Sequence, residues 1–181
     1  DKIKCIEVHL PFKLKGFDSD NGSEFLNHSL LRYFTDRKDK VAFTRSRPYR
    51  KNDNAHVEQK NWSCVRQLLG YDRIDDIKAV EIINDIYINE WSSLNNFFMP
   101  TMKLEKKSRD GSQIKKIHSK PITPYERLLA SKHLNELQKQ LLKNKYATLN
   151  PFELRSSMER KLTELFKLVK INAEIKKRGN I

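Results

Sequence analysis

Cysteine is scarce in this chain, which carries two among its 181 residues. Cys5 and Cys64 are too few for a disulfide framework, and neither belongs to a CxxC pair or to a paired histidine pattern of the kind that binds zinc. No run approaches the roughly 18 apolar residues that a membrane-spanning helix needs, and the mean hydropathy is -0.75. We therefore expect a protein of the reducing cytoplasm that has no membrane partner.

Acidic residues are also fewer than basic ones. The chain has 23 of them against 36 lysines and arginines, which gives a formal net charge of +13 and a pI near 9.7. A surplus of this size is typical of proteins that bind a polyanion, and nucleic acid is the polyanion we favour. A basic protein that is merely soluble is the alternative that composition leaves open.

The beginning of the chain lacks an initiator methionine and the apolar segment of a signal peptide. Its first ten residues, DKIKCIEVHL, mix charged and apolar side chains instead. We expect a fragment of a longer protein, although proteolytic processing gives the same beginning.

Residues 1–100 alternate between patterns typical of strands and of helices. The segment LKGFDS runs into Asp-Asn-Gly, a turn signal, and VAFTRS alternates β-branched and aromatic residues with smaller or polar ones. Other apolar residues recur at helical spacing, and one such stripe stops at Gly70, a C-cap residue. We expect a short helix within 1–13, a strand at 14–19, a helix from 23 to about 39, a strand at 41–46, a helix from about 55 to 70, and a long helix that is capped by Asp75 or Asp76 and ends before Pro100.

Residues 101–181 differ in character from the first hundred. Lysines and arginines cluster on both sides of Asp110-Gly111, a pair typical of a hairpin turn. We expect a small basic β-ribbon here, either an accessory DNA surface or a solvated hairpin. Helices are expected at 125–130, at about 134–145, and from Pro151, with Asn150 as its cap. This last helix is a candidate interface for a homo-oligomer.

Three carboxylates stand where two elements can bring them together. Asp18 and Asp20 lie at the end of the first expected strand, and Glu58 lies on the first turn of the helix that follows the second strand. Hard divalent ions such as Mg2+ or Mn2+ bind carboxylate oxygens held by rigid elements. Two such ions can activate an attacking hydroxyl and stabilise a leaving 3′ oxygen on a phosphodiester. An aspartate before Asn-Gly is, by itself, usually only turn chemistry.

The residues around these acids resemble the catalytic core of insertion-sequence transposases and, more distantly, of retroviral integrases. The matching segments are DSDNGSEF and FTRSRPYRKNDNAHVEQKNWSCVRQLLGYDR, with a weaker match at KPITPYERLLAS. Members of this family share an RNase H-like fold and an Asp, Asp, Glu triad that binds metal and cuts and joins DNA. The resemblance implies that Asp20 is the second acid and Glu58 the third, and that Asp18 has no family role.

The family's first aspartate has no counterpart in this sequence. In the family it lies several tens of residues upstream of the second acid, whereas only 19 residues precede Asp20. With two of three carboxylates, one metal site would be lost or weakened. We therefore expect the isolated chain neither to cut nor to join DNA.

Basic and polar residues flank the loop before the Glu58 helix, where the resemblance implies that substrate DNA passes. A solvated basic loop is the alternative. We interpret Trp62 as a packing residue rather than a base-stacking one. The candidate DNA-contacting residues are Arg45, Arg47, Tyr49, Arg50, Lys51, His56, Lys60 and Arg66.

These observations predict an α/β protein. Residues 1–100 would form the C-terminal part of an RNase H-like core truncated at its N-terminus, and residues 101–181 a basic β-ribbon with a mainly helical C-terminal region. The parent activity would be Mg2+-dependent DNA strand cleavage and transfer in transposition. Its partners would be transposon ends and target DNA, on the bacterial nucleoid. A non-catalytic DNA-binding remnant, and a nuclease on the same fold, are the alternatives.

Overall fold

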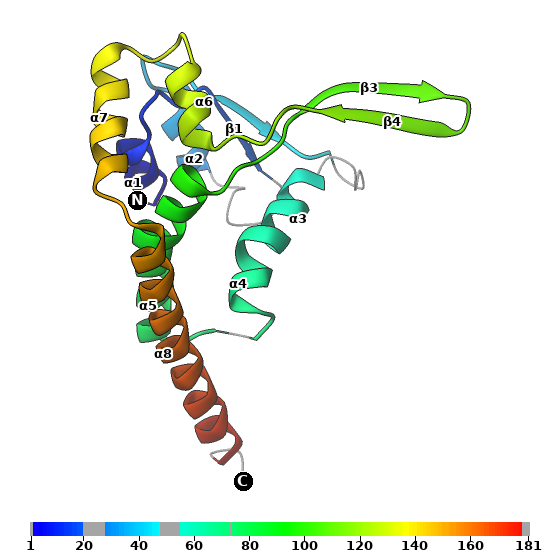
Figure 1. Cartoon of the computed structure of the whole chain (residues 1–181). Helices are drawn as coiled ribbons and strands as arrows, with labels where there is room; N and C mark the ends of the chain where they lie inside the picture. The colour runs from blue at the N-terminus through cyan, green and yellow to red at the C-terminus, as the bar shows by residue number, and fades with distance from the viewer. Residues whose placement is uncertain (1, 20–27, 48–54, 73, 179–181) are drawn as a thin grey trace. The chain divides into compact units, whose positions relative to one another are not determined.

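Figure 1 shows the computed structural model, which describes residues 2–19, 28–47, 55–72 and 74–178. Within these residues the chain is a mixed α/β protein, mostly helical, with two small two-stranded sheets. Its compact units are Asp1–Arg73 and Ile74–Ile181. The helical segment expected to end before Pro100 belongs to the second unit. The assignment of residues 1–100 to a catalytic core stays a prediction.

The first unit contains a parallel pair of strands. β1 (Gly16–Ser19) and β2 (Ala42–Arg45) are in register from Gly16 opposite Ala42 to Ser19 opposite Arg45. A parallel pair needs a crossover connection, and α2 (His28–Thr35) lies in that connection. The expected strands at 14–19 and 41–46 are therefore confirmed, with narrower bounds.

Three phenylalanines form the core between this sheet and α2. Phe34 on α2 is fully buried, and its ring centroid lies 4.9 Å from that of Phe17 on β1 and 5.8 Å from that of Phe43 on β2. Phe17 and Phe43 are register partners, so both rings stand on the sheet face that α2 covers. Val41 and Leu69 are also buried.

α1 (Lys2–His9), the short N-terminal helix that the sequence predicts, is held to α2 and the segment after it. The carboxylate of Glu7 accepts a hydrogen bond from the Tyr33 hydroxyl and another, at 2.8 Å, from Arg37 Nη1. The Tyr33 hydrogen bond, followed by that of Arg37, lowers the pKa of Glu7, and the same contact raises the pKa of Tyr33. The docking of α1 therefore depends on an ionised Glu7.

The helix that carries Glu58 is interrupted by a π-helical turn. It runs as α3 (Ala55–Asn61), η3 (Trp62–Arg66) and α4 (Gln67–Leu69), and it ends at Gly70, whose φ of 74° confirms the expected C-cap. Sequence periodicity did not predict the π-helical turn. Trp62 is 55% exposed, so it lies outside the buried core of the described residues, and the choice between packing and base stacking stays a prediction.

The second unit begins with a long helical segment that ends before Pro100, as expected. It comprises α5 (Ile77–Ile86) and two π-helical turns, η4 (Tyr87–Trp91) and η5 (Leu94–Phe98). Asp76 caps its start, since its Oδ1 accepts a hydrogen bond from Ala79 N at 3.0 Å. Ala79 and Ile86 are fully buried.

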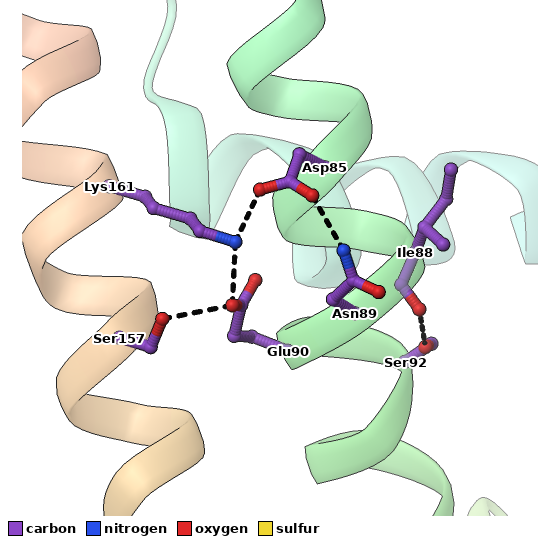
Figure 2. A network of polar contacts seen from close by, with 7 residues as sticks. All are labelled: Asp85, Ile88, Asn89, Glu90, Ser92, Ser157 and Lys161. Carbon is purple, nitrogen blue, oxygen red and sulfur yellow. Dashed lines mark hydrogen bonds and ion pairs between the residues drawn. The ribbon is translucent and has the colours of Figure 1, made fainter.

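Lys161 on α8 (Pro151–Arg178) ties that helix to the long segment, as Figure 2 shows. Its Nζ pairs with Asp85 and donates a hydrogen bond of 2.6 Å to Glu90 Oε1, which also accepts one of 3.0 Å from Ser157 Oγ. Burial alone would lower the pKa of Lys161, but the hydrogen bonds to both carboxylates raise it overall. The Lys161 hydrogen bond is also the main reason that the pKa of Asp85 is lowered.

The remaining part of the second unit is a β-ribbon followed by two shorter helices. β3 (Leu104–Asp110) and β4 (Gln113–His118) are antiparallel around Gly111, whose φ is 58°, so the expected hairpin is confirmed. α6 (Pro124–Ala130) and α7 (Glu136–Ala147) follow it. The rings of Phe97, Tyr125 and Tyr146 pack where η5, α6 and α7 meet, with Tyr125 and Tyr146 centroids 4.8 Å apart.

Candidate functional site

The parallel register of β1 and β2 brings two chain segments to one edge of the first unit's sheet. Both strands end there, with Ser19 opposite Arg45, and Ser46 N donates a hydrogen bond of 3.0 Å to Ser19 O. Ser19, which directly precedes Asp20, therefore lies beside Arg45 and Ser46, which precede the Glu58 helix in the chain. The carboxyl edge of a parallel sheet is a common position for ligand sites in α/β proteins.

Glu58 lies in the first turn of α3 and is exposed to solvent. Trp62 follows it by four residues, which puts the two side chains on the same side of the helix. Lys60 is exposed as well. An exposed carboxylate and an exposed indole on one side of a helix are accessible to a metal ion or to a nucleic acid, whereas Lys60, two positions from Glu58, lies on another side.

Several predicted site residues lie outside the described part of the chain. They are Asp20, Tyr49, Arg50 and Lys51, and the side chain of His56, whose backbone belongs to α3. No group of three or more His, Cys, Asp or Glu side chains capable of holding a metal is found among the residues that the structure describes. Asp20 is not one of those residues, so the expected pairing of Asp20 with Glu58 stays a prediction.

Asp18 is engaged within the sheet. Its Oδ1 accepts a hydrogen bond of 2.7 Å from Thr44 Oγ1, its register partner on β2. Ser19, the next residue, is 3% exposed, and its hydroxyl has no hydrogen-bond partner within the described residues. Ser19 directly precedes Asp20, so this buried hydroxyl lies at the start of the segment that bears the expected metal ligand.

The three arginines predicted to contact DNA that the structure describes differ in how they are held. Arg45 is exposed, with its guanidinium carbon 6.0 Å from the centre of the Phe43 ring, and Arg47 is exposed as well. Arg66 donates a hydrogen bond of 3.3 Å to Gly70 O and lies 5.0 Å from the Tyr71 ring centroid. Arg66 therefore stabilises the end of its own helix, and contact with DNA stays a prediction for all three residues.

The sequence patterns did not reveal two features. The exposure of Trp62 had no local signal, because an apolar helix position is read as buried by default. The burial of Glu90, whose side chain is 7% exposed, follows from Lys161, 71 positions away along the chain. A long-range pair of this kind leaves no trace in local spacing.

In the described part of the chain, no helix is both long and apolar enough to cross a membrane.

The chain is similar to a relative that has a name but no described function. Over 117 residues it is 39% identical to the uncharacterized protein y4rM of Sinorhizobium fredii (strain NBRC 101917 / NGR234). The match takes in 65% of this chain and 33% of the relative, so the chain spans about a third of that protein's length. No protein-family model matches the sequence, and no solved structure matches the fold.

Proposed function

We propose that this chain is part of the catalytic core of a DNA transposase or integrase with an RNase H-like fold. The parent protein would cut DNA strands and join them to a target, using Mg2+ or Mn2+. The observation that supports this proposal is the parallel pairing of β1 and β2, in which Ser19, the residue before Asp20, is the register partner of Arg45, on the strand that precedes the Glu58 helix.

The residue types of the proposed site suit a divalent metal. Asp20 and Glu58 would hold the ion through carboxylate oxygens, the ligands that Mg2+ and Mn2+ prefer. The bound ions would supply activation of the attacking hydroxyl and stabilisation of the leaving 3′ oxygen. The protein's own part is to hold Glu58 on the first turn of a helix, where it is open to solvent, and to anchor the residue before Asp20 on a strand.

A third carboxylate would have to come from a region outside this sequence. In the proposed parent, the first acid belongs to a strand that precedes Asp20 by several tens of residues. The matched relative is about three times as long as the matched region, which leaves ample length for such a strand in a protein of that size. We therefore expect this chain by itself to bind metal weakly and to leave DNA uncut.

DNA would approach the same edge through its phosphates. The candidate contacts are the cations of the loop and of the Glu58 helix, of which Arg45, Arg47 and Lys60 are exposed in the described residues. Lysine and arginine contacts to phosphates position a protein on DNA without reading its sequence. Trp62 adds an exposed ring on which an unpaired base can stack.

The proposal is tested by titrating the chain with Mn2+ in a calorimeter. Four proteins are compared: the parent chain, Asp20→Asn, Glu58→Gln and Asp18→Asn. The last is the matched control, because it removes a carboxylate two positions from Asp20 that is already engaged by Thr44. We expect Mn2+ binding in the parent and in the control, and its loss in the other two variants.

Three results would contradict the proposal. Binding that survives Glu58→Gln would show that the two acids do not share an ion. Binding that falls equally in Asp18→Asn would indicate a diffuse acidic site rather than a specific pair. A parent chain that binds no Mn2+ but retains affinity for DNA would favour the non-catalytic remnant.

A further inference from the structure

The β-ribbon of the second unit is exposed along both strands. Every residue of β3 and β4 is accessible to solvent, and Figure 1 shows the ribbon extending away from α6. An isolated two-stranded hairpin is only marginally stable in water. Here its base is held, because Thr101 and Ile122 form a backbone bridge and Arg127 on α6 donates hydrogen bonds to Thr101.

The strand register sorts the ribbon's side chains onto two faces. Directly opposed residues of an antiparallel pair share a face, as do residues two positions apart on one strand. Lys107 is opposite Lys116, and Arg109 is opposite Ile114. These four residues define what we call the Lys107 face. The other face carries Lys106, Ser108, Asp110, Gln113, Lys115 and Ile117.

The Lys107 face concentrates positive charge. Between residues 106 and 118 the one acidic residue is Asp110, which lies on the other face, and Glu105 falls at the register shift near the base of the ribbon. Like charges directly opposite each other on a ribbon destabilise it, and Lys107 and Lys116 are such a pair. In the described part of the chain, no ion pair includes a cation of this face. An external anion would remove the repulsion.

The arrangement fits a partner with closely spaced negative charges. Lys107 and Arg109 are about 7 Å apart along their strand, and Lys116 lies about 5 Å across from Lys107. Duplex DNA carries one charge for about every 1.7 Å of its axis. Its major groove, about 12 Å wide, admits a two-stranded β-ribbon. Arg109 Nε donates a hydrogen bond of 3.1 Å to Gly111 O, which holds the guanidinium at the ribbon's tip.

We propose that the Lys107 face of the ribbon docks into the groove of duplex DNA, with Lys107, Arg109 and Lys116 contacting phosphates. This inference rests on the proposed function for one point only, which is that the partner is DNA. It needs neither Asp20 nor Glu58. Ile114 lies between the cations and is 53% exposed. It would contact thymine methyl groups in the major groove.

The test measures fluorescence anisotropy of a labelled duplex of random sequence, in EDTA and at several NaCl concentrations. The variant Lys107→Gln with Lys116→Gln removes one lysine from each strand on the Lys107 face. The matched control, Lys106→Gln with Lys115→Gln, removes one lysine from each strand on the other face. The two variants therefore have the same net charge and the same composition, and circular dichroism checks that both keep the helices.

We expect the Lys107-face variant to bind duplex about tenfold more weakly near physiological salt, with a salt-dependence slope reduced by nearly 2. The control should remain within about twofold of the parent. Equal weakening in both variants would overturn the proposal, because charge alone would then explain binding. So would an equal effect on single-stranded DNA, or a loss seen on anionic phospholipid vesicles instead of duplex.

The two proposals fail separately. EDTA removes divalent ions, so the outcome for the ribbon does not depend on the metal ligands. If the two ribbon variants bind DNA equally, the metal-site proposal is unaffected. If the chain binds no Mn2+, the proposal for the Lys107 face is unaffected.

Discussion

The charge of Lys161 is important for the stability of the second unit. Its ammonium group pairs with two carboxylates, those of Asp85 and of Glu90, and the side chains of Lys161 and Glu90 are 22% and 7% exposed. Removing one partner of a buried ion pair leaves the other charge without compensation in a region of low polarity. Glu90 Oε2 already has no hydrogen-bond partner within the described residues.

Lys161→Met is therefore expected to lower the free energy of unfolding by about 2 to 3 kcal/mol, measured by urea denaturation followed by circular dichroism. Arg155→Ala is the control on the same helix. The ion pair between Arg155 and Glu159 is exposed on both sides, so its loss should cost less than about 0.5 kcal/mol. Equal losses in the two variants would contradict the structural role of Lys161.

Residue-level predictions from the sequence succeeded where the chemistry is local. Asp76 and Asn150 cap their helices, and Gly70 ends one with positive φ, because each role depends on a few neighbouring backbone groups. The candidate site is less predictable. The motif identifies Asp20 and Glu58, but whether their side chains meet depends on how the intervening loop folds. The burial of Glu90 depends on Lys161, which is remote in sequence.

At the scale of elements, α1 is attached by a contact that titrates. The pKa of Glu7 is lowered chiefly by the Tyr33 hydrogen bond and then by Arg37. A group with a lowered pKa in the folded state adds stability above its unfolded pKa, and that stability is lost as pH falls through the folded value. The docking of α1 should therefore persist from pH 7 to 5 and weaken as pH falls through and below the ordinary glutamate pKa of about 4.3.

Hydrogen-exchange protection factors of the α1 amides, corrected for intrinsic rates, follow this change. The variant Tyr33→Phe keeps the ring against Phe34, where the centroids are 5.4 Å apart, and removes the hydroxyl. Because the largest cause of the Glu7 shift is then gone, the loss of protection should move to higher pH. Unchanged protection at pH 3, or an identical pH profile in the variant, would refute this account.

The order of helices and strands was largely predictable, whereas their internal geometry was not. The strand at 42–45, the ribbon around Gly111 and the helix from Pro151 follow from side-chain period, turn residues and caps. The π-helical turns η3, η4 and η5 follow no such rule, since a single extra residue per turn is decided by packing.

At the scale of the whole molecule, the two compact units differ in how extensively buried side chains pack against their helices and strands. The first unit has a sheet of two four-residue strands and a core around Phe34. The second has long helices that bury Ile86 and Leu165 completely. Small sheets with few buried side chains open at low free energy, whereas packed helices open near the global limit.

Native-state hydrogen exchange of the intact chain should therefore show β1 and β2 amides exchanging through openings of lower free energy than those of α5 and α8. The expected difference is at least about 2 kcal/mol, a small part of the range that native proteins span. Equal protection in both units would mean that they unfold together, and the division at residue 73 would then have no thermodynamic meaning.

The bridge between Thr101 and Ile122 makes the ribbon a self-contained insert, since the chain leaves and re-enters the helical unit at one point. Its length can vary in evolution or by design without moving η5 or α6. Strand side chains alternate with a period of two. Adding two residues to each strand, between the base and the lysines, keeps Lys107 and Lys116 on the same face of the ribbon. Adding one residue to each strand there turns both lysines to the opposite face. The ribbon can therefore lengthen on this side only by an even number of residues per strand.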